Sequence, residues 1–152
     1  GESDVPVARE SMHRGVQGRE EDVKPEVEFA TVKEPRPTHV LLEDEAAVRD
    51  LQPDMRALGK INRMVICTAP GEDYDIVSRV FVPAWGVPED SVTGSAHAAL
   101  APFWAEKLGQ DTISAYQASR RGGILQCRMD GERVWLGGPC VTVVEGLFHL
   151  PE

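Results

Sequence analysis

A short polar segment, residues 89–95, gathers the residue types that could do chemistry in this chain. It holds two carboxylates, three hydroxyls and Gly94, and an apolar run that predicts a helix follows it directly. The first N–H groups of a helix attract anions, Gly94 lets a ligand approach the backbone, and Ser95 can add a hydroxyl donor. This combination suits a substrate carboxylate. The simpler interpretation is that Thr93 or Ser95 caps the helix while Asp90 favours its dipole.

Two other kinds of site fit the spacing of this segment poorly. Asp90, Ser95 and His97 are the residue types of a hydrolase, but side chains two positions apart on a helix point in different directions. The chain also lacks the Gly-x-Ser-x-Gly sequence of a nucleophile elbow. Glu89, Asp90 and His97 lack the paired imidazoles or cysteines of a metal site. We therefore expect no metal, and we expect His97 to be a packed histidine with satisfied hydrogen bonds.

A second polar cluster, residues 116–123, ends a predicted strand in a glycine turn that carries Arg120 and Arg121. Guanidinium groups can hold a carboxylate through two hydrogen bonds. The simpler interpretation is a solvent-exposed hairpin corner in which glycine supplies a positive φ. Arg79, in the middle of another predicted strand, either pairs with a neighbouring acid or faces a ligand cleft.

Short strands around one apolar helix must position these residues. Period-two and apolar runs predict strands at 38–42, 64–67, 76–82, 112–117, 124–129, 133–136 and 140–144. Two short helices are expected, one at 46–51 and one with Pro53 at its first position and Gly59 after its end. The segment from Gly86 to Gly109 opens as a polar loop and continues as a predicted helix. This helix is apolar almost all round, and therefore expected to be buried, and it contains Pro102. The fold class is α+β, a curved and mostly antiparallel sheet wrapped around a central apolar helix.

Composition limits the classes of function. The chain has 152 residues, of which 41% are hydrophobic and 27% charged, so one domain is expected. Its net charge of -9 repels phosphate backbones and anionic lipid, so we expect neither nucleic acid nor membrane as a partner. Three separated cysteines, no apolar stretch of membrane-spanning length and no signal peptide indicate a cytoplasmic protein.

The first 37 residues differ from the rest in polarity and in the spacing of their apolar residues. They are polar and lack periodicity, which is typical of a disordered tail, although weak alternation at 27–32 could form an edge strand. We therefore divide the chain into a tail, residues 1–37, and a folded lobe, residues 38–152.

Seven stretches of the folded lobe follow one another in an order that resembles a known family. They are residues 47–54, 68–71, 73–75, 78–83, 89–97, 100–104 and 117–123. This order resembles the C-terminal half of the phenazine-biosynthesis PhzF-like family, whose members have the diaminopimelate-epimerase fold. The resemblance runs from about Thr38 to Gly146. The family usually has proline where this chain has Ser91.

The resemblance implies an isomerase of two similar lobes, with the substrate held between the N-termini of their central helices and with no cofactor. In the phenazine member of the family, an acid of the N-terminal lobe moves a proton on a dihydro-hydroxyanthranilate. By match, Asp90 would be the second acid/base group or its hydrogen-bonding partner, and Ser95 would assist proton handling. Thr93, Gly94 and Ser95 would bind the substrate carboxylate.

The family's N-terminal lobe, with its catalytic glutamate, has no counterpart in this sequence. We therefore expect half of an active site, and three interpretations stay open. The chain is part of a PhzF-like isomerase, completed by a separate N-terminal lobe or by a second copy in a homodimer, and then has exposed apolar surface. Alternatively, it is a non-catalytic module that binds a small carboxylate or a protein, or a decayed reading frame without a function of its own.

Overall fold

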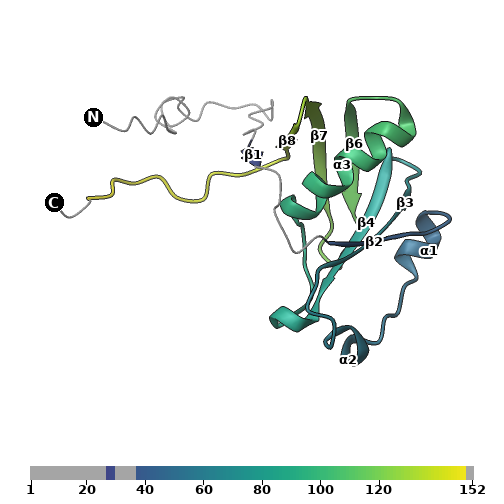
Figure 1. Cartoon of the computed structure of the whole chain (residues 1–152). Coiled ribbons are helices and arrows are strands. Elements are labelled where there is room, and N and C mark those ends of the chain that lie inside the picture. Colours follow the sequence, from purple (N-terminus) through teal and green to yellow (C-terminus); the bar gives the residue numbers. More distant parts are fainter. Residues whose placement is uncertain (1–26, 30–36, 150–152) are drawn as a thin grey trace.

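The structure, a computed structural model, describes residues 27–29 and 37–149 (Figure 1). Almost all of the predicted tail therefore lies outside the described residues. The strands are β1 (Val27–Phe29), β2 (Thr38–Leu41), β3 (Val65–Pro70), β4 (Ile76–Val82), β5 (Val87–Glu89), β6 (Thr112–Gln117), β7 (Gly123–Asp130) and β8 (Arg133–Gly137). The helices are α1 (Glu45–Arg49), α2 (Met55–Leu58), the 3₁₀ helix η2 (Pro83–Trp85) and α3 (Gly94–Leu108).

The strands of the described residues form one mixed sheet in the order β1-β8-β7-β6-β4-β3-β2, and β5 pairs with β4 beside this path. The pairs β2–β3 and β4–β6 are parallel, and all the other pairs are antiparallel. The predicted α+β class with a mostly antiparallel sheet is therefore confirmed. β1 occupies the edge beside β8, within the range where weak alternation indicated an edge strand.

β4 lies in the middle of the sheet between two apolar layers. Val80 belongs to the main core cluster with Trp104 of α3, whereas Phe81 packs on the opposite face near Met55 and Leu58 of α2. Successive strand residues point to opposite faces, so an almost continuous apolar run is what a doubly covered strand requires. β4 matches the predicted strand 76–82 residue for residue.

The short helices begin at aspartate caps. Asp44 accepts a hydrogen bond from the Ala47 N–H, and α1 begins at the next residue. Asp54 accepts from the N–H groups of the second and third residues of α2. The prediction that Pro53 is the first helical residue is wrong because Asp54 caps the helix and Pro53 lies before the cap. Aspartate accepts from the free first-turn N–H groups, which proline cannot do.

α3 covers one face of the sheet (Figure 1). Its residues Ala96, Leu100, Ala101 and Trp104 are buried, and the Trp104 indole N–H donates to the Thr68 hydroxyl at 3.1 Å. The opposite side of the helix, which carries Pro102 and Phe103, is exposed. The expectation of a helix buried all round is therefore wrong, since one sheet can cover only one side of a helix.

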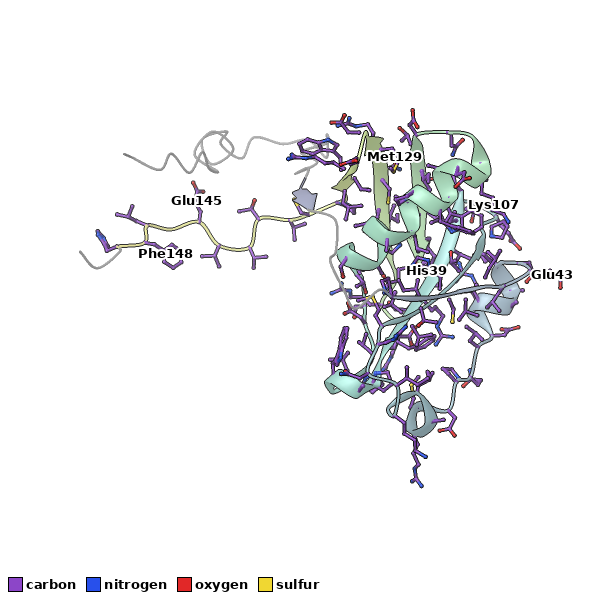
Figure 2. All side chains as sticks on the ribbon, in the orientation of Figure 1. His39, Glu43, Lys107, Met129, Glu145 and Phe148 are labelled. Atoms are coloured by element: carbon purple, nitrogen blue, oxygen red, sulfur yellow. The ribbon has the colours of Figure 1, made fainter. Side chains whose placement is uncertain are left out.

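The predicted strand 140–144 does not form. Residues 140–149 run away from the sheet without secondary structure, as the yellow trace in Figure 1 shows. Figure 2 labels Glu145 and Phe148 along this segment, far from the sheet and the helices. Its apolar side chains are more than four-fifths exposed; they are Val141, Val143, Val144, Leu147 and Phe148. We call residues 140–149 the C-terminal segment. A strand is stable only when another strand pairs with it, and the described residues supply none here.

No helix in the described ranges, 27–29 and 37–149, is long and apolar enough to cross a membrane.

Candidate functional site

The loop between β5 and α3 carries the predicted site. The Asp90 N–H donates to the Val80 carbonyl of β4 at 3.0 Å, which holds the start of the loop against the middle of the sheet. Thr93 then stands at the N-cap of α3, with extended backbone dihedrals. Asp90, Thr93, Gly94 and Ser95 are thereby brought together at one helix end.

The N-terminus of α3 has no side-chain cap. Thr93 occupies the cap position, but its hydroxyl makes no capping bond, and it donates at 2.6 Å to Oδ2 of Asp90. The interpretation that the Thr93 side chain caps the helix is therefore wrong, because its hydroxyl oxygen accepts from none of the first helix N–H groups. Among the described residues, no group accepts from the N–H groups of Gly94, Ser95 and Ala96. The N–H groups of Gly94 and Ser95, which are half-buried, are therefore available to a ligand, whereas Ala96 is completely buried.

The Asp90 carboxylate is held inside the loop. Its Oδ1 accepts from the Ser91 N–H at 2.8 Å, and its Oδ2 accepts from the Thr93 hydroxyl. A carboxylate has about four lone-pair positions, so both oxygens can still accept a further proton or hydrogen bond. The carboxylate is thus oriented by its neighbours and is partly accessible.

Ser95 and Gly94 are half-buried at the first turn of α3. Among the described residues, none exchanges a hydrogen bond with the Ser95 hydroxyl, so it does not cap the helix either. Gly94 lines a cavity of about 390 Å³ that adjoins the helix end. The remaining lining residues are Val92, Arg121, Gly122, Gly123, Ile124, Leu125, Leu136, Gly137, Gly138 and Pro139.

The turn of the second polar cluster closes one side of this cavity. Gly122 has φ 74°, a left-handed conformation that favours glycine, and a Cβ at Gly123 would overlap the Val92 side chain. The predicted glycine turn with a positive φ is confirmed. Arg120 and Arg121 are exposed, and Arg121 lies at the cavity wall, where its charge can reach an anion.

Gln117 and Ser119 tie this turn to the loop, which the sequence analysis missed. The Gln117 Nε2 donates to the Asp90 carbonyl at 2.8 Å, and the Ser119 hydroxyl donates to the Ser91 carbonyl at 2.7 Å. The sequence does contain a sign that Gln117 is buried, because it lies two positions after Ala115 and four after Ile113, on the buried face of β6. A polar residue at a buried phase of a strand needs a specific partner.

His97 is a structural residue. Its Nδ1 lies 2.8 Å from the Thr93 carbonyl, and its Nε2 lies 3.2 Å from the Ser78 hydroxyl. Since a carbonyl can only accept, Nδ1 carries the ring proton and Nε2 accepts from Ser78. Burial lowers the pKa of His97, although the bond to the Thr93 carbonyl opposes part of the shift. The prediction of a packed, satisfied histidine is confirmed.

Of the two alternatives for Arg79, an ion pair or a ligand cleft, the structure shows the ion pair with a neighbouring acid. Its Nε and Nη2 donate to the two carboxylate oxygens of Glu89 at 2.7 and 3.0 Å. Its Nη1 donates to carbonyls of the last residues of α1 and to that of Leu51, just after the helix, at 2.8 Å. The hydrogen bond from Arg79 to Glu89 raises the pKa of the guanidinium. Arg79 therefore joins β4, β5 and the end of α1, beside the loop that carries Asp90.

Within residues 27–29 and 37–149, no three His, Cys, Asp or Glu side chains gather in a group that could hold a metal ion.

Comparison with known proteins supports one family. A family model described as "Phenazine biosynthesis-like protein" matches residues 4–146. An uncharacterized isomerase of Pseudomonas aeruginosa is 52% identical over 112 residues, which are 73% of this chain and 43% of that protein. An uncharacterized isomerase of Halalkalibacterium halodurans is 44% identical over 106 residues, which are 68% of this chain and 40% of that protein. The chain thus spans about two fifths of the length of these relatives.

Solved structures agree with this assignment. The crystal structure of a phenazine biosynthesis protein of the PhzF family from Enterococcus faecalis has a TM-score of 0.64 and 46% identity, and it covers 66% of this chain and 39% of that one. A phenazine biosynthesis PhzC/PhzF protein from Clostridium difficile has a TM-score of 0.67 and 33% identity, and it covers 84% of this chain and 54% of that one. The family model covers most of the chain, and both the sequence and the fold resemble those of PhzF proteins. This chain therefore belongs to the phenazine biosynthesis-like PhzF family.

Proposed function

We propose that the chain contributes one half of the active site of a cofactor-independent isomerase that moves a proton on a small cyclic or amino-acid-derived carboxylic acid. The observation that carries this proposal is the uncapped N-terminus of α3 beside Asp90. A helix end that only stabilised the fold would gain about 1 kcal/mol from a side-chain cap. Here the hydroxyl at the cap position donates to Asp90, accepts from Gln117 and accepts from no helix N–H, so the N–H groups of Gly94 and Ser95 are left for a substrate.

The substrate carboxylate binds at the first turn of α3. The N–H groups of Gly94 and Ser95 donate to it, the positive end of the helix dipole attracts it, and the Ser95 hydroxyl adds a donor. Thr93 contributes indirectly by orienting Asp90. The rest of the substrate lies toward the cavity next to Gly94, where Arg121 adds a positive charge.

Asp90 acts as the general base. As a carboxylate it accepts a proton from one substrate carbon, and a second acid returns a proton at another carbon, so that the substrate is isomerised and no atoms are lost. The Ser91 N–H and the Thr93 hydroxyl keep the Asp90 carboxylate in a fixed orientation throughout. Acid/base catalysis of this kind contributes roughly 10²- to 10⁴-fold in rate.

The second acid comes from another folded unit, which also covers the C-terminal segment. The chain covers 43% of its Pseudomonas aeruginosa relative, so a comparable length of that protein lies outside the match. Five apolar side chains of the segment are exposed, and burying each of them would stabilise an assembly by roughly 1.5–3 kcal/mol. A separate N-terminal lobe is the partner that we favour, and a homodimer is the alternative.

A non-catalytic carboxylate-binding module is a second candidate function. The observation that favours it is the engagement of both Asp90 oxygens by groups of its own loop. Such a carboxylate could serve only to shape the helix end. This function keeps the anion site and lacks proton transfer.

Two measurements on the 152-residue chain test the proposal. Amide NMR would follow a titration with anthranilate, a small aromatic amino acid, and we expect shifts at Gly94 and Ser95 that are weakened by Ser95→Ala. Thr112→Ala, which removes an exposed hydroxyl at the far end of β6, is the matched control and should bind normally. Binding absent from the helix end would refute both candidate functions.

The second measurement is uptake of deuterium from D₂O by candidate acids, with the chain alone and with the N-terminal part of its Pseudomonas aeruginosa relative added. Uptake that disappears with Asp90→Asn supports the isomerase. Binding without uptake under both conditions supports the non-catalytic module.

A further inference from the structure

Gln117 is the only fully buried amide side chain in the described core, and it lies in an otherwise apolar row. Ile113 and Ala115, which precede it at period two on β6, are both completely buried in the main core cluster. A buried amide without partners would cost roughly 1–3 kcal/mol. Its conformation is therefore determined by the hydrogen bonds that it makes.

Every hydrogen-bonding group of this amide is directed at the loop before α3. Its Oε1 accepts from the Thr93 N–H at 2.8 Å. Its two Nε2 protons go to the Asp90 carbonyl at 2.8 Å and to the Thr93 hydroxyl oxygen at 3.2 Å. These partners also fix which end of the amide is oxygen, since an N–H needs an acceptor and a carbonyl needs a donor.

The bond to the Thr93 hydroxyl oxygen helps to fix the orientation of that hydroxyl. A hydroxyl has one proton and two acceptor positions. Gln117 fills one acceptor position, and the proton goes to Oδ2 of Asp90 at 2.6 Å. Threonine at an N-cap usually accepts from the second or third helical N–H, but here no such bond forms. The amide thus links the orientation of Asp90 to the open end of the helix.

We infer that Gln117 is a positioning residue that holds Asp90 in place and keeps the N–H groups of Gly94 and Ser95 free for a substrate carboxylate. This inference rests on the proposed function for its purpose, and on the hydrogen bonds of Gln117 for its mechanism. Gln117 acts through Thr93 and Asp90 and does not itself contact the substrate.

The first test needs no ligand. Gln117→Met keeps the size of the side chain and removes its three hydrogen bonds, and amide hydrogen exchange on the full chain reports the result. We expect the Thr93 N–H to be protected in the unsubstituted chain and to exchange at least tenfold faster in the variant, while the interior of β6 keeps its protection. An unprotected Thr93 N–H in the original chain, or equal protection in the variant, overturns the inference.

The second test measures benzoate affinity from the amide shifts of Gly94 and Ser95 in the folded population, so loss of stability alone does not change the result. We expect Gln117→Met to weaken binding about tenfold, as loss of two or three hydrogen bonds that orient a site would. Adding Gln117→Met to Thr93→Val should weaken binding much less, since the hydroxyl through which Gln117 acts is then already absent.

Gln126→Met, on neighbouring β7, is the matched control and should bind normally. An unchanged benzoate affinity in Gln117→Met, or effects of Gln117→Met and Thr93→Val that simply add, would overturn the positioning role. If the original chain binds no benzoate at the helix end, the proposed function fails, and the exchange of the Thr93 N–H still decides how Gln117 acts.

Discussion

Acidification should destabilise the lobe through His97. The ring is completely buried, and its two nitrogens are hydrogen-bonded to the uncharged Thr93 carbonyl and Ser78 hydroxyl, so a second proton would create a charge away from water. Burial lowers the pKa of His97 from its usual 6.5. Below pH 6.5 the unfolded chain therefore binds a proton that the folded chain does not bind, and stability is lost as the pH falls.

The magnitude follows from one proton. While folded His97 stays unprotonated, each pH unit below the unfolded pKa lowers the free energy of unfolding by about 1.4 kcal/mol. A fall from pH 7.5 to 5.5 spans only one such unit, so it lowers the free energy of unfolding by about 1.4 kcal/mol in total. This range avoids the acids Glu45 and Asp75, whose pKa values are lowered by hydrogen bonds and which lose their contribution below about pH 4.5.

Urea unfolding at pH 7.5, 6.5 and 5.5 would measure this loss. His97→Asn keeps a donor toward the Thr93 carbonyl and removes the titrating ring, so the variant should be less stable but should lose about 1.4 kcal/mol less over the same range. His39→Gln is the comparison: desolvation also lowers the pKa of His39, but this residue is exposed, so its replacement should remove much less of the pH dependence than His97→Asn does. An unchanged pH dependence in His97→Asn would refute the reasoning.

Three further outcomes are expected. Gly123→Ala should lower the free energy of unfolding by about 1–3 kcal/mol, since its Cβ overlaps Val92, and Val92→Ala should restore part of the loss in urea unfolding. Arg79→Met should cost about 2–4 kcal/mol by the same measurement, because it leaves the carboxylate of Glu89 unpaired, whereas Glu89→Gln should cost less. Phe148→Asp should change stability by less than about 0.5 kcal/mol because the ring is 92% exposed, yet light scattering should show weaker assembly with a second lobe or copy.

The sequence predicts best the strands with regularly buried residues, on both faces of β4 and on one face of β6. β4 and β6 begin and end where the apolar periodicity does, because burial on the sheet faces determines both the pattern and the strand. The C-terminal segment carries a similar pattern, with Val141 and Val143 two positions apart, but it is not a strand here. Periodicity shows that a segment can pair, and the partner strand must come from elsewhere.

The sequence predicts the position of the polar loop before the long helix, but not the interactions that set the geometry of this loop. Residues 89–95 are contiguous, so their polar composition before an apolar run is visible locally. Gln117 lies 24 positions from its partner Thr93, and nothing in a single sequence states that the end of β6 meets the start of α3. Contacts between distant residues depend on topology, which here follows from the parallel pairing of β6 with β4.

Thr93 explains why local rules misjudged the helix end. A threonine before a helix predicts a side-chain cap, and the cap would have left the helix donors satisfied. The hydroxyl has a single proton and a charged acceptor 2.6 Å away, and hydrogen bonds to charged groups are roughly twice as strong as neutral ones. Thr93 is therefore turned toward Asp90, its oxygen accepts from Gln117 and from no helix N–H, and the donors that remain open suit the carboxylate substrate that we propose. In this chain, an uncapped helix end is the feature that supports the proposed function most directly.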